Sequence, residues 1–145
     1  MPSVQDTYTQ FHGRALEGMV PNGELNNIVS RVVENSGGIG FGKAAFYGTV
    51  EDSCRAAAAS AVFLGVTVLD RTQPADLYAK GATAGVLTQG PVWVLVTEAV
   101  TVGSAAYYTA ADGTFSDTST GNVAVPGGRF ETATSGAGLA LLRLS

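Results

Sequence analysis

The sequence contains few charged residues. Only 14% of its 145 residues are Asp, Glu, Lys or Arg, against about 25% in an average globular chain. A surface with so little charge tends to associate, so we expect partners to cover much of it. The net charge is −4, and the eight Lys and Arg residues are scattered between Arg14 and Arg143. Because no basic stripe is present to neutralise phosphates, nucleic acid is not an expected partner.

Cysteine and long hydrophobic runs are also scarce. The single cysteine, Cys54, excludes an intrachain disulfide, and its surroundings, "SCRAAA", hold no second Cys or His. This pattern favours a small packed residue over a nucleophile. The longest apolar run, Ala56 to Leu69, has 14 residues, fewer than the ~20 that span a bilayer. The N-terminus has no apolar segment typical of a secretory signal, so we expect a soluble protein made in the cytoplasm, with no membrane partner.

Recognisable catalytic motifs are absent as well. Gly37, Gly42 and Lys43 have the spacing of a phosphate-binding loop, but that loop requires Ser or Thr after the lysine and then a helix. Ala44 follows instead, and "AAFYG" is typical of a strand. His12 is the only histidine, and a solvated or interface role is favoured over the alternative of a catalytic triad. No cluster has metal-ligand spacing, so we expect no metal site.

What the sequence does contain is a series of short alternating segments separated by Gly, Pro, Asp and Asn. The segments are "IGFGKAAFYG", "AVFLGVTVLD", "AGVLT", "PVWVLVTEAV", "SAAYYTA", "TFSDT", "NVAVPG", "RFETAT" and "GLALLRL". Residues 27–33 fit either a short helix or a strand, and their β-branched content favours a strand. Only "CRAAAASA" has the alanine content of a helix. The sequence therefore predicts an all-β sandwich or barrel of about eight or nine strands.

The two ends of the chain have different expected roles. Residues 1–19 have no apolar period and are interpreted as an extended N-terminal arm, ordered by what it binds. Its candidate partner contacts are Tyr8, Phe11, Arg14 and Leu16. Residues 20–145 are expected to form a single domain. The turn "SGAG" should fold Leu139–Leu144 back onto Arg129–Thr134, so that the last strand completes a sheet.

Several blocks form a characteristic set. They include Phe41-Gly42 entering a strand, "FLGV" at 63–66, the "Y.KG.T..VLT.G..WV" pattern from Tyr78 to Val94, and the C-terminal "VPG.RF.T....G.A.L.L". Together they resemble the structural cement proteins of tailed bacteriophages, which are capsid decoration proteins. The similarity runs from about Gly18 to Leu144 and preserves the order and spacing of the blocks. One departure is Ser104, where the family commonly has Asp.

The resemblance implies a jelly-roll-like β body and a non-enzymatic role without a cofactor. It implies a protein that binds the outer surface of an icosahedral shell, contacts the major capsid protein and bridges its subunits. It also implies self-association, for which we expect a dimer more than a trimer. The acidic composition suits a position outside the shell, away from packaged DNA.

Two other kinds of protein share part of this sequence pattern. A tail-fibre-type carbohydrate- or receptor-binding domain is also all-β and poor in charge, but should display aromatics in loops, whereas Trp93 lies within a predicted strand. A small dUTPase-like enzyme needs a glycine-rich tail that covers phosphate, whereas this chain ends in an apolar strand.

Overall fold

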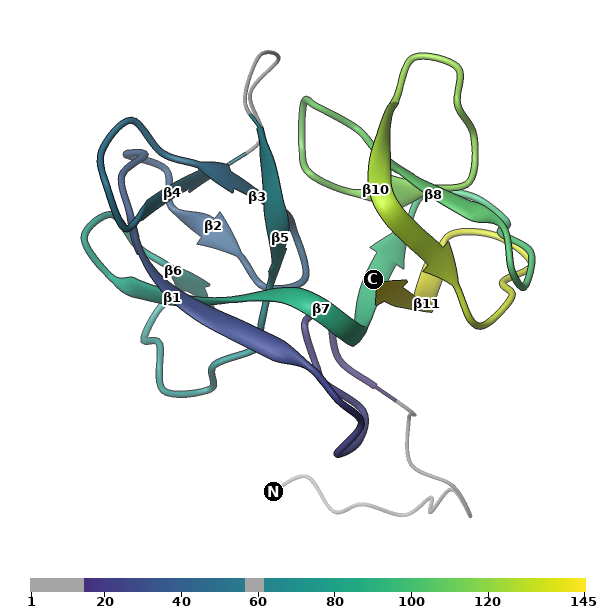
Figure 1. Ribbon diagram of the computed structural model, residues 1–145, viewed down its shortest axis with the longest axis horizontal. Coiled ribbons are helices and arrows are strands. Elements are labelled where there is room, and N and C mark those ends of the chain that lie inside the picture. The colour runs from purple at the N-terminus through teal and green to yellow at the C-terminus, as the bar shows by residue number, and fades with distance from the viewer. Residues whose placement is uncertain (1–14, 57–61) are drawn as a thin grey trace, which may run out of the picture.

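The described part of the protein is built from β-strands. The computed structural model describes residues 15–56 and 62–145 (Figure 1). The strands are β1 (Asn27–Val33), β2 (Ile39–Gly40), β3 (Ala44–Tyr47), β4 (Ser53–Ala56), β5 (Phe63–Thr67), β6 (Leu77–Tyr78), β7 (Thr83–Val96), β8 (Ala105–Tyr108), β9 (Phe115–Ser116), β10 (Val123–Phe130) and β11 (Gly138–Leu144). Within these residues no helix occurs, which confirms the all-β prediction.

Two ambiguous segments are resolved by these assignments. Residues 27–33 form strand β1, as the β-branched content favoured. The only candidate helix begins at Cys54, yet Ser53–Ala56 form strand β4. Because Cys54 and Ser53 pack into the interior, tertiary packing overrides the helix propensity of the alanines here. The rest of that candidate, 57–61, lies outside the described residues.

The first half of the chain closes into a ring of five strands. Strand β1 pairs in parallel with β4, and the pairing continues through β3 and β5 to β7. The amino-terminal half of β7 then pairs antiparallel with β1, from Thr83 opposite Val32 to Gln89 opposite Asn27, and closes the ring. This is a mixed five-stranded β-barrel. The two-residue strands β2 and β6 form a separate small sheet.

The second half of the chain closes on the other part of β7. Strand β11 pairs with β7 over seven residues, from Gly138 opposite Val96 to Leu144 opposite Gly90. Strands β10, β8 and β9 follow, and β9 returns to β7 at Val96. In Figure 1 the two groups of strands lie on either side, with β7 running from one to the other. The strands therefore close into rings, in agreement with the barrel alternative of the prediction. The observed strand pairing does not show the jelly roll that the resemblance implied.

One long strand replaces two predicted ones. "AGVLT" and "PVWVLVTEAV" were expected as separate strands, but both belong to β7. The Gly-Pro pair at 90–91 does not end the strand because it marks the point where β7 changes neighbours, from β1 to β11. Gly90 has φ +113°, and a Cβ atom there would lie 2.6 Å from Asn26 Cβ, so the crossing requires glycine. The expected pair "NVAVPG" and "RFETAT" is likewise replaced by the single strand β10, with a register shift between Ala124 and Arg129.

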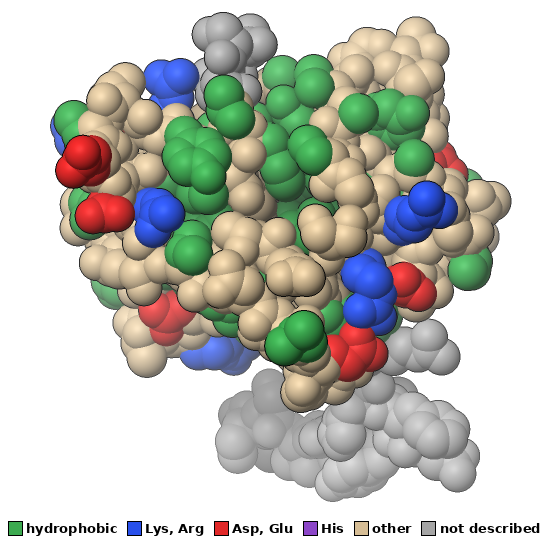
Figure 2. Space-filling view, in the orientation of Figure 1, with side chains coloured by type: hydrophobic (Ala, Val, Ile, Leu, Met, Phe, Trp, Pro, Cys, Tyr) green, Lys and Arg blue, Asp and Glu red, His purple; other side chains and the backbone are tan. Residues whose placement is uncertain are grey.

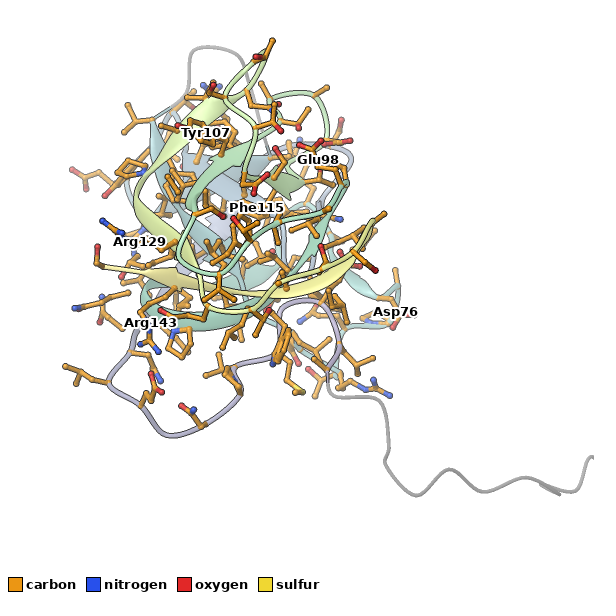
Figure 3. All side chains as sticks on the ribbon, turned by 90° about the vertical axis from the view of Figure 1, so that its right-hand side faces the viewer. Asp76, Glu98, Tyr107, Phe115, Arg129 and Arg143 are labelled. Atoms are coloured by element: carbon orange, nitrogen blue, oxygen red, sulfur yellow. The ribbon has the colours of Figure 1, made fainter. Side chains whose placement is uncertain are left out.

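The apolar side chains form two cores. One lies within the first barrel and includes Val33, Ile39 and Val86. The other continues from Phe46 and Leu87 into the second ring, where Phe115 and Phe130 are fully buried. Phe115 is labelled within the second ring in Figure 3.

Candidate interaction site

Only one of the four predicted contact residues lies in the described part of the chain. Leu16 is 48% exposed. Tyr8, Phe11 and Arg14 lie outside the described residues, so their role stays a prediction. His12 also lies outside them.

Residues 16–19, which the sequence assigns to the arm, contact the body directly. The Gly18 amide donates to the Trp93 carbonyl at 2.7 Å, and the Trp93 amide donates to the Met19 carbonyl at 3.0 Å. The Leu69 amide donates to the Gly18 carbonyl at 2.8 Å, and Lys43 Nζ lies 2.9 Å from the Glu17 carboxylate. The chain therefore joins the body at β7, between the two rings. Where the arm ends stays a prediction.

An apolar patch lies where the first ring meets the second. We call it the seam patch and define it as Tyr47, Val62, Phe63 and Val123. Tyr47, Val62 and Val123 are 51%, 68% and 45% exposed, and Phe63 is partly exposed. The Tyr47 amide donates to the Val62 carbonyl at 3.0 Å, which joins the ends of β3 and β5. Figure 2 shows hydrophobic side chains gathered on the upper part of this face, near the upper ends of β3, β5 and β10.

Packed aromatic rings link the two sides of the seam patch. Phe63 of the first ring stacks on Tyr108 of the second, with centroids 5.6 Å apart and planes 14° apart. Phe46 meets both rings edge-on, at 6.0 and 5.1 Å. Tyr108 is opposite Val123 in the β8–β10 pairing, so the packed rings connect Phe63 to the strand pair that carries Val123. Burial raises the pKa of Tyr108, which keeps its phenol neutral beneath the patch. Each aromatic pair of this kind stabilises the fold by ~0.5–1.5 kcal/mol in addition to the effect of burying its surface. The pairs therefore hold the residues beneath the patch in place.

A groove lies beside residues 16–17. This groove, with a volume of about 460 Å³, has Leu16, Phe41, Lys43, Leu69, Arg71 and Asp76 among its lining residues. Phe41 and Leu69 come from the first barrel, whereas Leu16 comes from the segment that leads to the N-terminus. The groove is therefore at the base of the predicted arm.

Charged side chains near the C-terminus are already paired within the chain. Arg143 of β11, labelled in Figure 3, has Nη1 2.7 Å from Glu24 and Nε 2.8 Å from Glu131. These contacts raise the pKa of Arg143 and lower that of Glu24. The arrangement ties segment 21–26 to the last strand, so these charges have a structural role.

The geometry of the described residues does not assemble a catalytic or metal site. The glycines at 37–42 lead into strands and no helix follows Lys43, whose ammonium group binds Glu17. Burial raises the pKa of the Cys54 thiol to about 11, so it stays protonated and unreactive. Among residues 15–56 and 62–145, no three His, Cys, Asp or Glu side chains gather as metal ligands. The same residues include no helix that could cross a membrane.

Sequence reasoning missed the seam patch. Alternation along a strand shows that Tyr47 and Val62 can face outward, but not that Phe63 beside them packs against Tyr108, which is opposite Val123. That adjacency depends on the closure of both rings on β7. The exposed Tyr47 at the end of an otherwise buried strand was the only local signal.

Comparison with known proteins agrees with this architecture. A chain in the structure titled "The capsid of Myoviridae Phage XM1" matches with a TM-score of 0.77 and 18% identity, covering 99% of this chain and 98% of that one. A second structure, "The crystal structure of head fiber gp8.5 N base in bacteriophage phi29", has a TM-score of 0.46 and 16% identity, covering 83% and 95%. The first similarity shows a shared fold. No curated protein matches the sequence.

The family comparison covers almost the entire chain. The sequence profile described as "Structural cement protein (E217 gp24/Pam3 gp6)" matches residues 4–145. This agrees with the resemblance seen in the sequence blocks and decides among the three functions considered from the sequence. The chain belongs to the phage structural cement protein family and is a non-enzymatic structural component of the phage capsid.

Proposed function

We propose that the protein binds the outer surface of the icosahedral shell, contacts major capsid protein subunits and bridges them. The observation that carries this proposal is the exposed apolar seam patch on a body whose strands are otherwise paired. Each of the nine strands in the larger sheet has a neighbour on both sides. Although β1 pairs with β4 only at Val32 and Val33, these pairings close both rings, and we assign binding to exposed side chains and not to strand addition.

The seam patch has the chemistry of a protein interface. Tyr47 and Phe63 are aromatic residues of the kind that protein interfaces favour, and Val62 adds an exposed aliphatic surface. Exposed apolar groups in a contiguous patch usually mark a partner site. In this proposal the patch contacts the major capsid protein, while Tyr8, Phe11, Arg14 and Leu16 supply further partner contacts and the protein self-associates.

Cementing of this kind needs no chemical step. Each copy that contacts two shell subunits adds a free-energy cost to their separation. Since many copies occupy one shell, modest individual contacts sum to a large effect. The body also has the rigidity that a bridge requires, because both rings are closed and share β7.

The double variant Tyr47→Ser, Val62→Ser tests the proposal. The number of copies bound to capsids that lack the protein is measured against protein concentration. Loss of two interface anchors at more than 1 kcal/mol each should weaken binding by about tenfold or more. Both side chains are at least half exposed, so the thermal midpoint of the free protein should change little.

The matched control is Val102→Ser. Val102 is 66% exposed, close to the 68% of Val62, but lies in the loop whose Gly103 binds Phe130, at the opposite end of β10 from Val123. Its occupancy curve should match that of the unaltered protein. Full occupancy by the double variant would show that the seam patch does not contact the shell.

A further inference from the structure

The groove beside Leu16 has the properties of a peptide-binding site. Its apolar lining comes from Leu16, Phe41 and Leu69. Phe41 is only 9% exposed and meets Tyr78 edge-on at 5.2 Å, so this floor is held in place by the first core. A large apolar side chain that enters the groove would meet a preformed surface. Binding then needs little free energy to order the residues that line the groove.

Charges of both signs surround this apolar floor. Lys43 is neutralised by Glu17 at 2.9 Å. Arg71 and Asp76 also line the groove, and both are exposed, so they supply one positive and one negative charge. A complementary ligand would carry large apolar side chains together with one acidic and one basic group.

The N-terminal segment of this chain has that composition. Residues 1–14, "MPSVQDTYTQFHGR", contain two aromatic residues, Tyr8 and Phe11, with Asp6 on one side and Arg14 on the other. Fully extended, 14 residues span up to about 46–50 Å, which exceeds the radius of gyration of about 15 Å expected for a domain of this size. The segment can therefore reach beyond its own body.

The position of the groove favours a partner's segment over the chain's own. Leu16 lines the groove, so the segment starts from the groove's edge. To place its own Phe11 over Phe41, the chain would have to reverse within the four residues 12–15. A segment from a second copy meets no such constraint. When two copies face each other, the groove of each copy binds the segment of the other. These reciprocal contacts are those of a two-fold interface.

We propose that this groove binds residues 1–14 of a second copy, and that two copies exchange these segments reciprocally. Phe11 and Tyr8 occupy the apolar floor, Arg14 faces Asp76 and Asp6 faces Arg71. The inference deepens the proposed function, on which it rests, because it names the second copy as the partner of the predicted contacts Tyr8, Phe11 and Arg14. The seam patch is left free for the shell.

Photo-crosslinking of the full-length protein tests the exchange. Phe11 is replaced by p-benzoyl-phenylalanine, the protein is irradiated, and the products are separated by mass and mapped by peptide sequencing. The expected product is a covalent dimer whose cross-links fall on peptides that contain Phe41 or residues 69–71. Its yield should fall as the protein is diluted, since the reaction joins two chains.

A groove variant and a matched control accompany this measurement. The double change Leu16→Glu, Arg71→Glu alters two exposed positions of the groove and should lower the dimer yield about tenfold, through loss of an apolar contact and reversal of a charge. Val102→Glu adds a charge at a similarly exposed apolar site and should leave the yield unchanged. Circular dichroism confirms that each variant is folded.

Other outcomes would overturn the inference. Cross-links within one chain to the groove, at a yield independent of concentration, would place the segment on its own body. Cross-links that map elsewhere, or none at all, would show that the groove is not the binding site. These failures are distinct from failure of the proposed function, because the seam-patch variant is measured by occupancy on capsids and leaves the groove unaltered.

Discussion

Gly65 shows how the absence of a single side chain allows two strands to pair. It lies in β5 and is buried opposite Ala45 of β3. A Cβ atom at this position would collide with the carbonyl oxygen of Leu87 and lie 2.9 Å from its carbonyl carbon. Both atoms belong to the backbone of β7, so they cannot move aside as the end of a flexible side chain can. The close approach of β5 to β7 therefore depends on glycine.

The substitution Gly65→Ala should destabilise the protein by at least the ~1–3 kcal/mol typical of overpacked cores. Urea denaturation followed by circular dichroism measures the loss. Gly136→Ala is the control, because nothing lies within 4 Å of a Cβ atom built there and its removal of backbone freedom should change stability by less than about 1 kcal/mol. Equal midpoints for the two variants would contradict this account of the strand contact.

The sequence indicates many such residues without giving their reasons. It identifies Gly65 as part of the "FLGV" block, but the reason for a glycine there is a contact with a strand about 20 residues further along the chain. It also predicts Leu16 as a candidate partner contact, yet not the groove beside it, since Phe41, Leu69 and Asp76 come together only after the first barrel closes. The type of residue at each position can be interpreted from the sequence. Which distant residues lie side by side in the folded protein cannot.

At the scale of elements, strand existence is predicted better than strand continuity. The segments around Val86 and Trp93 are both recognised as strands because both are rich in β-branched and apolar residues. Their fusion into β7 is missed because Gly-Pro usually signals a turn. Here the pair accommodates a change of neighbours, and the local rule is overridden by the pairing of β1 on one side and β11 on the other.

The last strand, β11, has the role that the sequence predicts for it. It lies between β7 and β10, and the Glu131 amide donates to the Leu141 carbonyl at 2.8 Å. Alternate residues face the interior, so that Ala140, Leu142 and Leu144 are buried while Leu141 is partly exposed. Strand β11 therefore closes the second ring, and its register decides which leucines fill the core.

Two single substitutions in β11 should differ in their effect. Leu142→Ala removes a fully buried side chain that is opposite Val92 and Phe130, and should cost about 2–5 kcal/mol of unfolding free energy. Leu141→Ala, one residue away on the other face, should cost clearly less because its side chain is already partly in water. Urea titrations with equal slopes give the comparison. Losses of the same size would mean that the strand is not held in the observed register.

At the scale of the whole molecule, the shared strand β7 should make the two rings one folding unit. Leu87 of its first half and Val92, Val94 and Val96 of its second half belong to the same core, which also includes Phe46 from the first barrel and Phe130 from the second ring. Neither ring can open without exposing part of this core. Although the first barrel also has a core of its own, both rings contribute to this larger core, unlike independent domains, each of which has its own core.

This sharing predicts that damage to one ring lowers the stability of the other by the same amount. Val33 is 1% exposed and lies in the core of the first barrel, so Val33→Ala should cost about 1.5–3 kcal/mol. Native-state hydrogen exchange then compares the amides of Thr67, bonded to Lys43 in the first ring, and Phe130, bonded to Ser104 in the second. If the rings unfold together, both amides lose the same free energy of protection, whereas Val102→Ala, at an exposed site, changes neither. Unaltered protection at Phe130 in the Val33→Ala variant would show instead that the second ring is stable alone and that residues 20–145 comprise two units.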